Sequence, residues 1–147
     1  MDGQSLSMMA LYVMLLCGLI VAVLFLLTLQ RALNTCAPAS RTMRPGMIWL
    51  CLIPGVGLVW QFFVVVHVAK TFANEFRRLG IAGPGPAPGQ AVGIAWAVCN
   101  CVSLIPFFGR LAVLVGMVLW IVYWNRVVKY YRMLETHQAA VAASAIG

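Results

Sequence analysis

The feature that most constrains the fold is a long apolar run near the start of the chain. Residues 8–29, MMALYVMLLCGLIVAVLFLLTL, contain no charged side chain. A helix of this length measures about 33 Å at about 1.5 Å per residue, and a bilayer core is about 30 Å thick. The preceding MDGQSLS is acidic, whereas a secretory signal begins with basic residues and has an apolar core of only about 7–15 residues. The run therefore predicts an uncleaved transmembrane helix over residues 8–30.

The rest of the composition agrees with a membrane environment. Of the 147 residues, 63% are hydrophobic and 9% are charged, whereas soluble proteins have about 25% charged residues. A chain this short leaves a large part of its surface exposed, so it cannot hide that much apolar area from water. We predict a single all-α integral membrane domain over residues 1–147.

Two further apolar stretches are broken by the same frame, Leu-Ile-Pro-x-x-Gly. It occurs as LIPGVG at residues 52–57 and as LIPFFG at residues 104–109. Proline removes a backbone donor and glycine permits sharp changes of direction. The frame predicts two broken-helix modules, residues 45–79 and 91–135, with breaks at Pro54, Gly55, Gly57, Pro106 and Gly109.

The remaining segments have simpler interpretations. Residues 80–90, GIAGPGPAPGQ, are rich in proline and glycine and predict an extended linker. Residues 136–147 form a tail without a recognisable signal.

Each module has two possible geometries, a kinked single span or a helical hairpin whose ends return to one side. Hairpins place nine of the ten basic side chains on one face, as the positive-inside rule favours. The N-terminus would then lie outside and the C-terminus in the cytoplasm. Length argues against a hairpin in the first module, because residues 45–53 reach only about 13 Å. Its tip would stop in the hydrocarbon, where broken backbone needs protein cover. We expect hairpins, and the kinked alternative stays open.

A basic amphipathic extension follows the long arm of each module. Phe72, Phe76 and Leu79 share one helical face in the first extension. The net charge of +7 comes from residues that flank apolar runs, which favours anionic lipid headgroups over nucleic acid. These extensions could lie on the membrane or dock a partner helix. The expected headgroup or partner contacts are Lys70, Arg77, Arg78, Arg126, Lys129 and Arg132.

Three polar residues stand in or beside the apolar arms: Gln61, Asn100 and His67. A buried amide in lipid needs a partner, so we expect a hydrogen bond between Gln61 and Asn100 that joins the modules. His67 lies one turn before Lys70. We expect it at headgroup level and not as a haem or proton ligand.

Catalytic groups are scarce. The three carboxylates are Asp2, Glu75 and Glu135, too dispersed for acid–base catalysis. Two of them are expected in helical ion pairs, Glu75 with Arg78 and Glu135 with Arg132. The five cysteines contain no C-x-x-C pair. The sequence therefore predicts no enzyme, no cofactor and no metal site.

Small residues recur at helical spacing in the second module. Gly109, Ala112 and Gly116 share one face, and such faces let membrane helices approach closely. They would pack the two arms of the hairpin or mediate self-association.

Residues 44–62, RPGMIWLCLIPGVGLVWQF, resemble a group of small bacterial membrane proteins of unknown function. The shared pattern is Pro-Gly-x-x-Trp, then Ile-Pro, then a Leu-containing helix. The resemblance implies a bacterial inner-membrane protein and no particular activity. It is carried by Pro45, Gly46, Trp49, Ile53, Pro54, Leu58 and Trp60.

Three functions fit these features. The first is a non-enzymatic scaffold or accessory subunit of a membrane complex, or a homo-oligomer, because broken helices need protein cover. The second is a small transporter or channel-like protein with a site between repeats, for which Gln61, Asn100 and His67 are the candidate lining groups. The third is a membrane-shaping hairpin protein.

Overall fold

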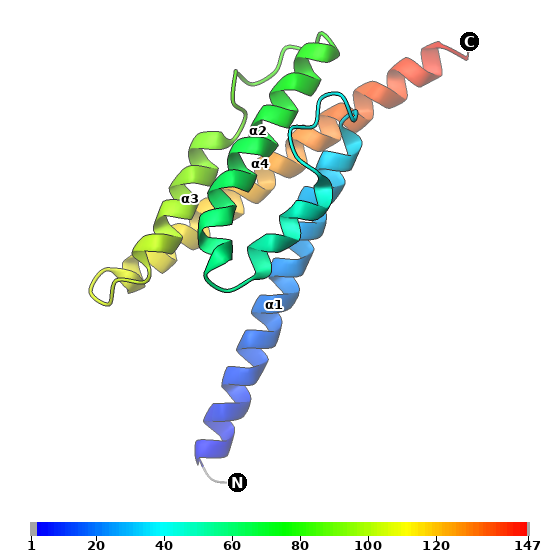
Figure 1. Ribbon diagram of the computed structural model, residues 1–147. Helices are drawn as coiled ribbons and strands as arrows, with labels where there is room; N and C mark the ends of the chain where they lie inside the picture. Colours follow the sequence, from blue (N-terminus) through cyan, green and yellow to red (C-terminus); the bar gives the residue numbers. More distant parts are fainter. Residues whose placement is uncertain (1–2, 147) are drawn as a thin grey trace.

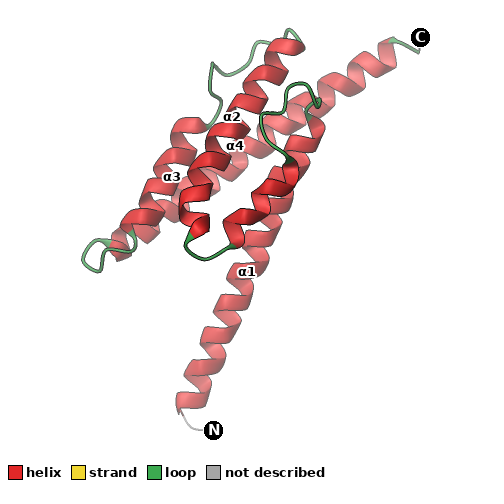
Figure 2. Cartoon of the chain, viewed as in Figure 1, coloured by secondary structure: helices red, strands yellow, loops and turns green. Residues whose placement is uncertain are grey.

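The computed structural model describes residues 3–146, and this part of the chain is helical without any strand (Figure 2). The predicted all-α fold is confirmed. The elements are α1 (Gly3–Thr35), the 3-10 helix η1 (Pro45–Leu52), α2 (Val56–Arg78), α3 (Gln90–Val102) and α4 (Gly109–Ser144) (Figure 1).

Three of these helices, α1, α2 and α4, are long and apolar enough to cross a membrane, and α3 is a shorter apolar helix. Two of them exceed the predicted ranges. Helix α1 begins five residues before residue 8 and ends at Thr35. Helix α4 runs through most of the predicted tail to Ser144, because the alanines of HQAAVAAS are strong helix formers.

Both Leu-Ile-Pro-x-x-Gly frames lie between two helices, and the chain reverses direction at each of them (Figure 1). The N–H of Gly57 donates to the carbonyl of Ile53 over 2.8 Å, and the N–H of Gly109 donates to Ile105 over 2.8 Å. The repeated frame therefore closes the same turn twice. The turns differ at the residue after proline, where Gly55 has a φ of 84° and so uses a conformation that glycine tolerates best.

The last glycine of each frame is required by close packing. A Cβ on Gly57 would collide with the carbonyl group of Cys51, and a Cβ on Gly109 would lie 2.6 Å from the carbonyl oxygen of Ser103. In each turn the new helix thus starts directly against the end of the preceding one. Only glycine fits there without moving the backbone.

Tryptophan side chains hold η1 in place. The indole N–H of Trp49 donates to Oε1 of Gln30 on α1 over 3.0 Å. The indole N–H of Trp60 on α2 donates to the carbonyl of Met47 over 2.7 Å. Both tryptophans belong to the stretch 44–62, so this stretch attaches η1 to its two neighbours.

An aromatic cluster joins α1 to α3 and α4. The ring of Phe25 is 5% exposed and meets four rings edge-on, with centroid distances between 5.5 and 6.2 Å. Such pairs contribute about 0.5–1.5 kcal/mol each beyond the burial of apolar area. The four partners are Trp96, Trp120, Tyr123 and Trp124.

Small residues let α3 approach both neighbours closely. A Cβ on Gly93 would lie 2.5 Å from Val65 of α2 and 2.8 Å from Tyr123 of α4. A Cβ on Gly116 would lie 3.2 Å from the Cβ of Cys99. The small-residue face that the sequence indicates in the second module therefore packs its two arms together.

The two amphipathic extensions pack against each other. Phe72 and Phe76 are 1% and 2% exposed, and both contact the ring of Tyr130 edge-on. Val127 and Leu134 of α4 are buried in the same core. The apolar faces of the extensions are thus covered within the chain.

Candidate functional site

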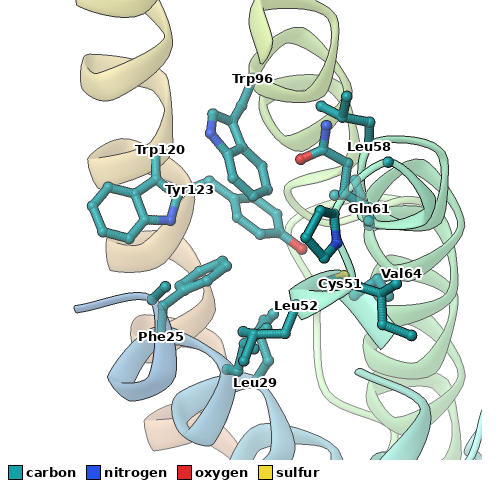
Figure 3. A pocket seen from close by; sticks show the side chains of 17 residues that line it. Phe25, Leu29, Cys51, Leu52, Leu58, Gln61, Val64, Trp96, Trp120 and Tyr123 are labelled. Carbon is teal, nitrogen blue, oxygen red and sulfur yellow. The ribbon is translucent and has the colours of Figure 1, made fainter. Parts of the chain in front are cut away.

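A cavity of about 290 Å³ lies between α1, the η1–α2 turn, α3 and α4. We call it the bundle cavity. Aromatic rings form one side of it and aliphatic side chains form most of the other (Figure 3). The residues labelled in that view are Phe25, Leu29, Cys51, Leu52, Leu58, Gln61, Val64, Trp96, Trp120 and Tyr123.

The amide of Gln61 forms part of the wall and is 7% exposed. Its Oε1 accepts a hydrogen bond from Nδ2 of Asn100 over 3.1 Å, so the predicted bond between the modules is present. Its Nε2 lies 3.5 Å from the carbonyl of Ala97, a long contact. Gln61 therefore joins α2 to α3 through both ends of its amide, and its Oε1 already accepts one hydrogen bond.

The hydroxyl of Tyr123 is the unexpected polar group of the site. Tyr123 is 2% exposed, and its buried hydroxyl has no hydrogen-bond partner among residues 3–146. It points from α4 towards Cys51 (Figure 3). A buried donor left unpaired costs about 1–3 kcal/mol. The sequence shows Tyr123 only as one of several aromatic residues, because the direction of its hydroxyl depends on how α4 packs.

The N-terminus of α2 also borders the bundle cavity. The helix starts at Val56, and its N-cap, Gly55, provides no side-chain hydrogen bond. Pro54, Gly55 and Gly57 all line the cavity. The first N–H groups of a helix have no acceptor within the first turn, and the helix dipole places partial positive charge there. The N–H of Gly57 already donates to the carbonyl of Ile53, so this wall offers the partial positive charge of the helix end and the other N–H groups of the first turn.

His67 lies apart from the other two candidate polar residues. Its Nδ1 is 2.8 Å from the carbonyl of Phe63, and its ring lies against the ring of Phe63 at a centroid distance of 3.7 Å. It does not line the bundle cavity. Gln61 and Asn100 are brought together, and His67 is not part of their site.

A buried carboxylate organises the opposite, charged part of the bundle. Glu75 is 0% exposed, and its Oε1 accepts from the guanidinium of Arg78 over 2.6 Å, as predicted. Its Oε2 accepts the N–H of Ala37 over 3.2 Å. Glu75 thus holds the loop after α1 against the end of α2.

The second predicted ion pair is wrong. Glu135 lies 3.6 Å from Arg31 of α1, and no contact joins it to Arg132 among the described ion pairs. The end of α1 runs beside α4 at this level, as Gln138 also donates to the carbonyl of Thr35 over 3.2 Å. Packing between helices therefore outcompetes the local i, i+3 pairing.

The C-terminal ends of α1, α2 and α4 gather at one end of the molecule, and the N-terminus of α1 lies at the other (Figure 1). We call this end of the molecule, with the loop 36–44, the basic end. All six predicted headgroup or partner contacts are exposed. They are Lys70, Arg77, Arg78, Arg126, Lys129 and Arg132.

The arrangement fits a class, the multi-pass helical membrane proteins, because three helices have the length and composition of membrane spans. No family model, curated protein or solved structure matches the chain. Within residues 3–146, no group of three or more His, Cys, Asp or Glu side chains is placed to hold a metal ion. The site must therefore be interpreted from its own chemistry.

Proposed function

We propose that the chain is a non-enzymatic, multi-pass protein of the bacterial inner membrane that works by assembly. It acts as a scaffold or accessory subunit of a membrane complex, or as a homo-oligomer. One observation carries the proposal: the η1–α2 turn is exposed beside the middle of α1, a position that would lie deep in the hydrocarbon.

The depth follows from the neighbours of the turn. The bundle cavity places Leu52, Pro54 and Gly55 beside Ala22 and Phe25, near the middle of α1. If residues 8–29 of α1 fill the hydrocarbon, the turn lies close to the bilayer centre.

The turn lacks cover from its own chain. Leu52, Ile53 and Val56 are 41%, 46% and 50% exposed. Lipid tails cannot hydrogen-bond irregular backbone, which occurs at this depth only where protein or water covers it. A second protein surface over the turn would meet this requirement.

Charge sets the proposed orientation. Nine of the ten basic residues lie in the loop 36–44 or from residues 31, 70 and 126 onward in α1, α2 and α4, towards the basic end, and Arg110 follows the other turn. The positive-inside rule then puts the basic end in the cytoplasm and the N-terminus outside. Both hairpins enter from the cytoplasmic side, where the exposed cations contact anionic headgroups or partner subunits.

The alternative functions have less support. A transport path needs polar groups along its length, yet the bundle cavity is mostly apolar and the Gln61 amide already binds α3. A membrane-shaping protein needs free apolar faces on its extensions, and those faces are buried against each other. Assembly with another protein would cover the η1–α2 turn, which remains exposed in the single chain.

Photo-crosslinking tests the proposal. A benzophenone amino acid at Val56 should crosslink to protein in native membranes, because the turn is expected to lie under a subunit. The matched control is Val118, which is 62% exposed on an uninterrupted part of α4 and should crosslink mainly to lipid. Purification in mild detergent should give a particle larger than the monomer. A monomeric particle with lipid adducts at both positions would refute assembly.

A further inference from the structure

We propose that the bundle cavity binds a membrane-soluble molecule that presents a carbonyl oxygen to the Tyr123 hydroxyl and to the N-terminus of α2. This site is independent of the assembly proposed above, because all its groups come from one chain. A covering subunit would change access to the site and not its chemistry.

The first reason is the unpaired hydroxyl. Tyr123 is 2% exposed, and its hydroxyl has no partner among the described residues. Tyr123 is one of the residues that line the bundle cavity, and its hydroxyl lies in the cavity wall on the side of Cys51 (Figure 3). Unpaired buried hydroxyls are rare in folded proteins and call for an explanation. A ligand oxygen that accepts its proton would provide one.

The second reason is the helix end that borders the same space. Helix α2 has no side-chain cap at Gly55, and although the N–H of Gly57 donates to Ile53, the partial positive charge of this helix end favours an electron-rich atom. The one amide acceptor in the wall, Oε1 of Gln61, already accepts one hydrogen bond from Asn100. The remaining N–H groups of the first turn are donors, and the Tyr123 hydroxyl can donate as well, which favours a ligand with an acceptor.

The walls define the rest of the ligand. Phe25, Trp96 and Trp120 supply flat aromatic surfaces, and Leu29, Leu52 and Val64 supply aliphatic ones. The volume of about 290 Å³ is at the small end of ligand pockets, which span about 300–1,000 Å³. It suits a single ring or a short piece of chain and not a whole phospholipid.

The position of the cavity points to the lipid phase as the source. Its wall includes Leu52 and Ile53, which are 41% and 46% exposed on the outer side of the bundle. A molecule dissolved in the hydrocarbon reaches this side directly. Two kinds of membrane molecule share the required chemistry, a quinone ring and the ester end of an acyl chain.

Thermal unfolding of the protein in nanodiscs tests the site with three probes at equal mole fraction. Menadione carries quinone carbonyls, methyl decanoate carries an ester carbonyl, and decane carries no oxygen. At saturation we expect at least one carbonyl probe to raise the melting temperature by about 3 °C or more above the effect of decane. The probe with the larger effect identifies the source.

Substitutions separate binding from a general effect on the bilayer. Tyr123→Phe keeps the ring and removes the hydroxyl, so it should fold and lose most of the carbonyl-specific shift. Tyr12→Phe is the matched control on an exposed side chain of α1 and should retain the shift. Ala22→Trp fills the cavity and should abolish it. Equal shifts with all three probes, or an unchanged response in Tyr123→Phe, would overturn the proposal.

Discussion

Gln61 shows how a single polar residue can be tolerated inside an apolar bundle. Its Oε1 accepts a hydrogen bond from the side-chain amide of Asn100 on α3 over 3.1 Å. Its Nε2 faces the carbonyl of Ala97, also on α3, at 3.5 Å. Ala97 and Asn100 lie about one turn apart on α3, so the Gln61 amide bridges one turn of that helix. At the scale of single residues, these polar side chains link the two modules through hydrogen bonds.

A double-mutant cycle measures this link. Gln61→Leu and Asn100→Leu should each lower the free energy of unfolding, because each leaves the other amide unpaired. The coupling between them should be about 0.6–2 kcal/mol, the range for hydrogen bonds between membrane helices. Thermal unfolding of the two single variants and the double variant gives the value. Strict additivity would show that the two amides do not interact.

The buried thiol of Cys36 offers a second test at this scale. Burial, followed by the nearby Glu75 carboxylate, raises the pKa of Cys36 to about 12. Thiolate is the reactive form, so a polar maleimide at pH 8 should leave Cys36 unmodified until the protein unfolds. An Ala39→Cys variant in the same loop is exposed and should react at once. Equal rates for both thiols in the folded protein would contradict the packing of this loop.

At the scale of helices and turns, glycine decides where elements can approach. Gly57 and Gly109 start α2 and α4 directly against the preceding helix, and Gly93 lets α3 sit between its two neighbours. The positions of both breaks could be predicted because Leu-Ile-Pro-x-x-Gly acts locally on the backbone. The 3-10 form of η1 could not be predicted, because it depends on contacts with other helices. The helical tail could not be predicted either, because α4 continues far beyond the frame.

Gly93→Ala tests the tight packing of α3. The added Cβ would lie 2.5 Å from Val65 and 2.8 Å from Tyr123, and overpacking costs about 1–3 kcal/mol. We therefore expect a lower melting temperature. Gly18→Ala on α1 is the control, because nothing lies within 4 Å of its new Cβ, and alanine favours the helix by up to about 1 kcal/mol. A stabilised Gly93→Ala variant would mean that α3 packs differently.

In the site too, features set by the local sequence could be predicted, and features set by packing between distant helices could not. The Gln61–Asn100 bond could be inferred because each amide stands alone in an apolar arm at a similar distance from its break. The Tyr123 hydroxyl and the pairing of Glu135 with Arg31 could not be inferred. Both depend on which helix lies beside α4, and periodicity within α4 carries no information about that.

At the scale of the whole molecule, the two ends of the bundle differ in charge and in packing. The basic end collects the ends of three helices, and the first half of α1 extends alone from the other end (Figure 1). From residue 4 to residue 21 every side chain of α1 is exposed, as expected for a helix that lipid surrounds. The chain would thus cross the membrane with α1 and pass into it again from the basic end with each of the two hairpins.

Side-specific labelling of single cysteines in a cysteine-free background tests this topology most directly. The positions are Ser7→Cys before the apolar run, Ala39→Cys in the loop after α1, Ala82→Cys in the linker and Ala140→Cys near the end of α4. A membrane-impermeant maleimide applied to intact cells should label only Ser7→Cys, and the other three should react only after the membrane is opened. Labelling of Ala82→Cys from outside, with Ala39→Cys protected, would mean that α2 crosses the bilayer and would contradict the account.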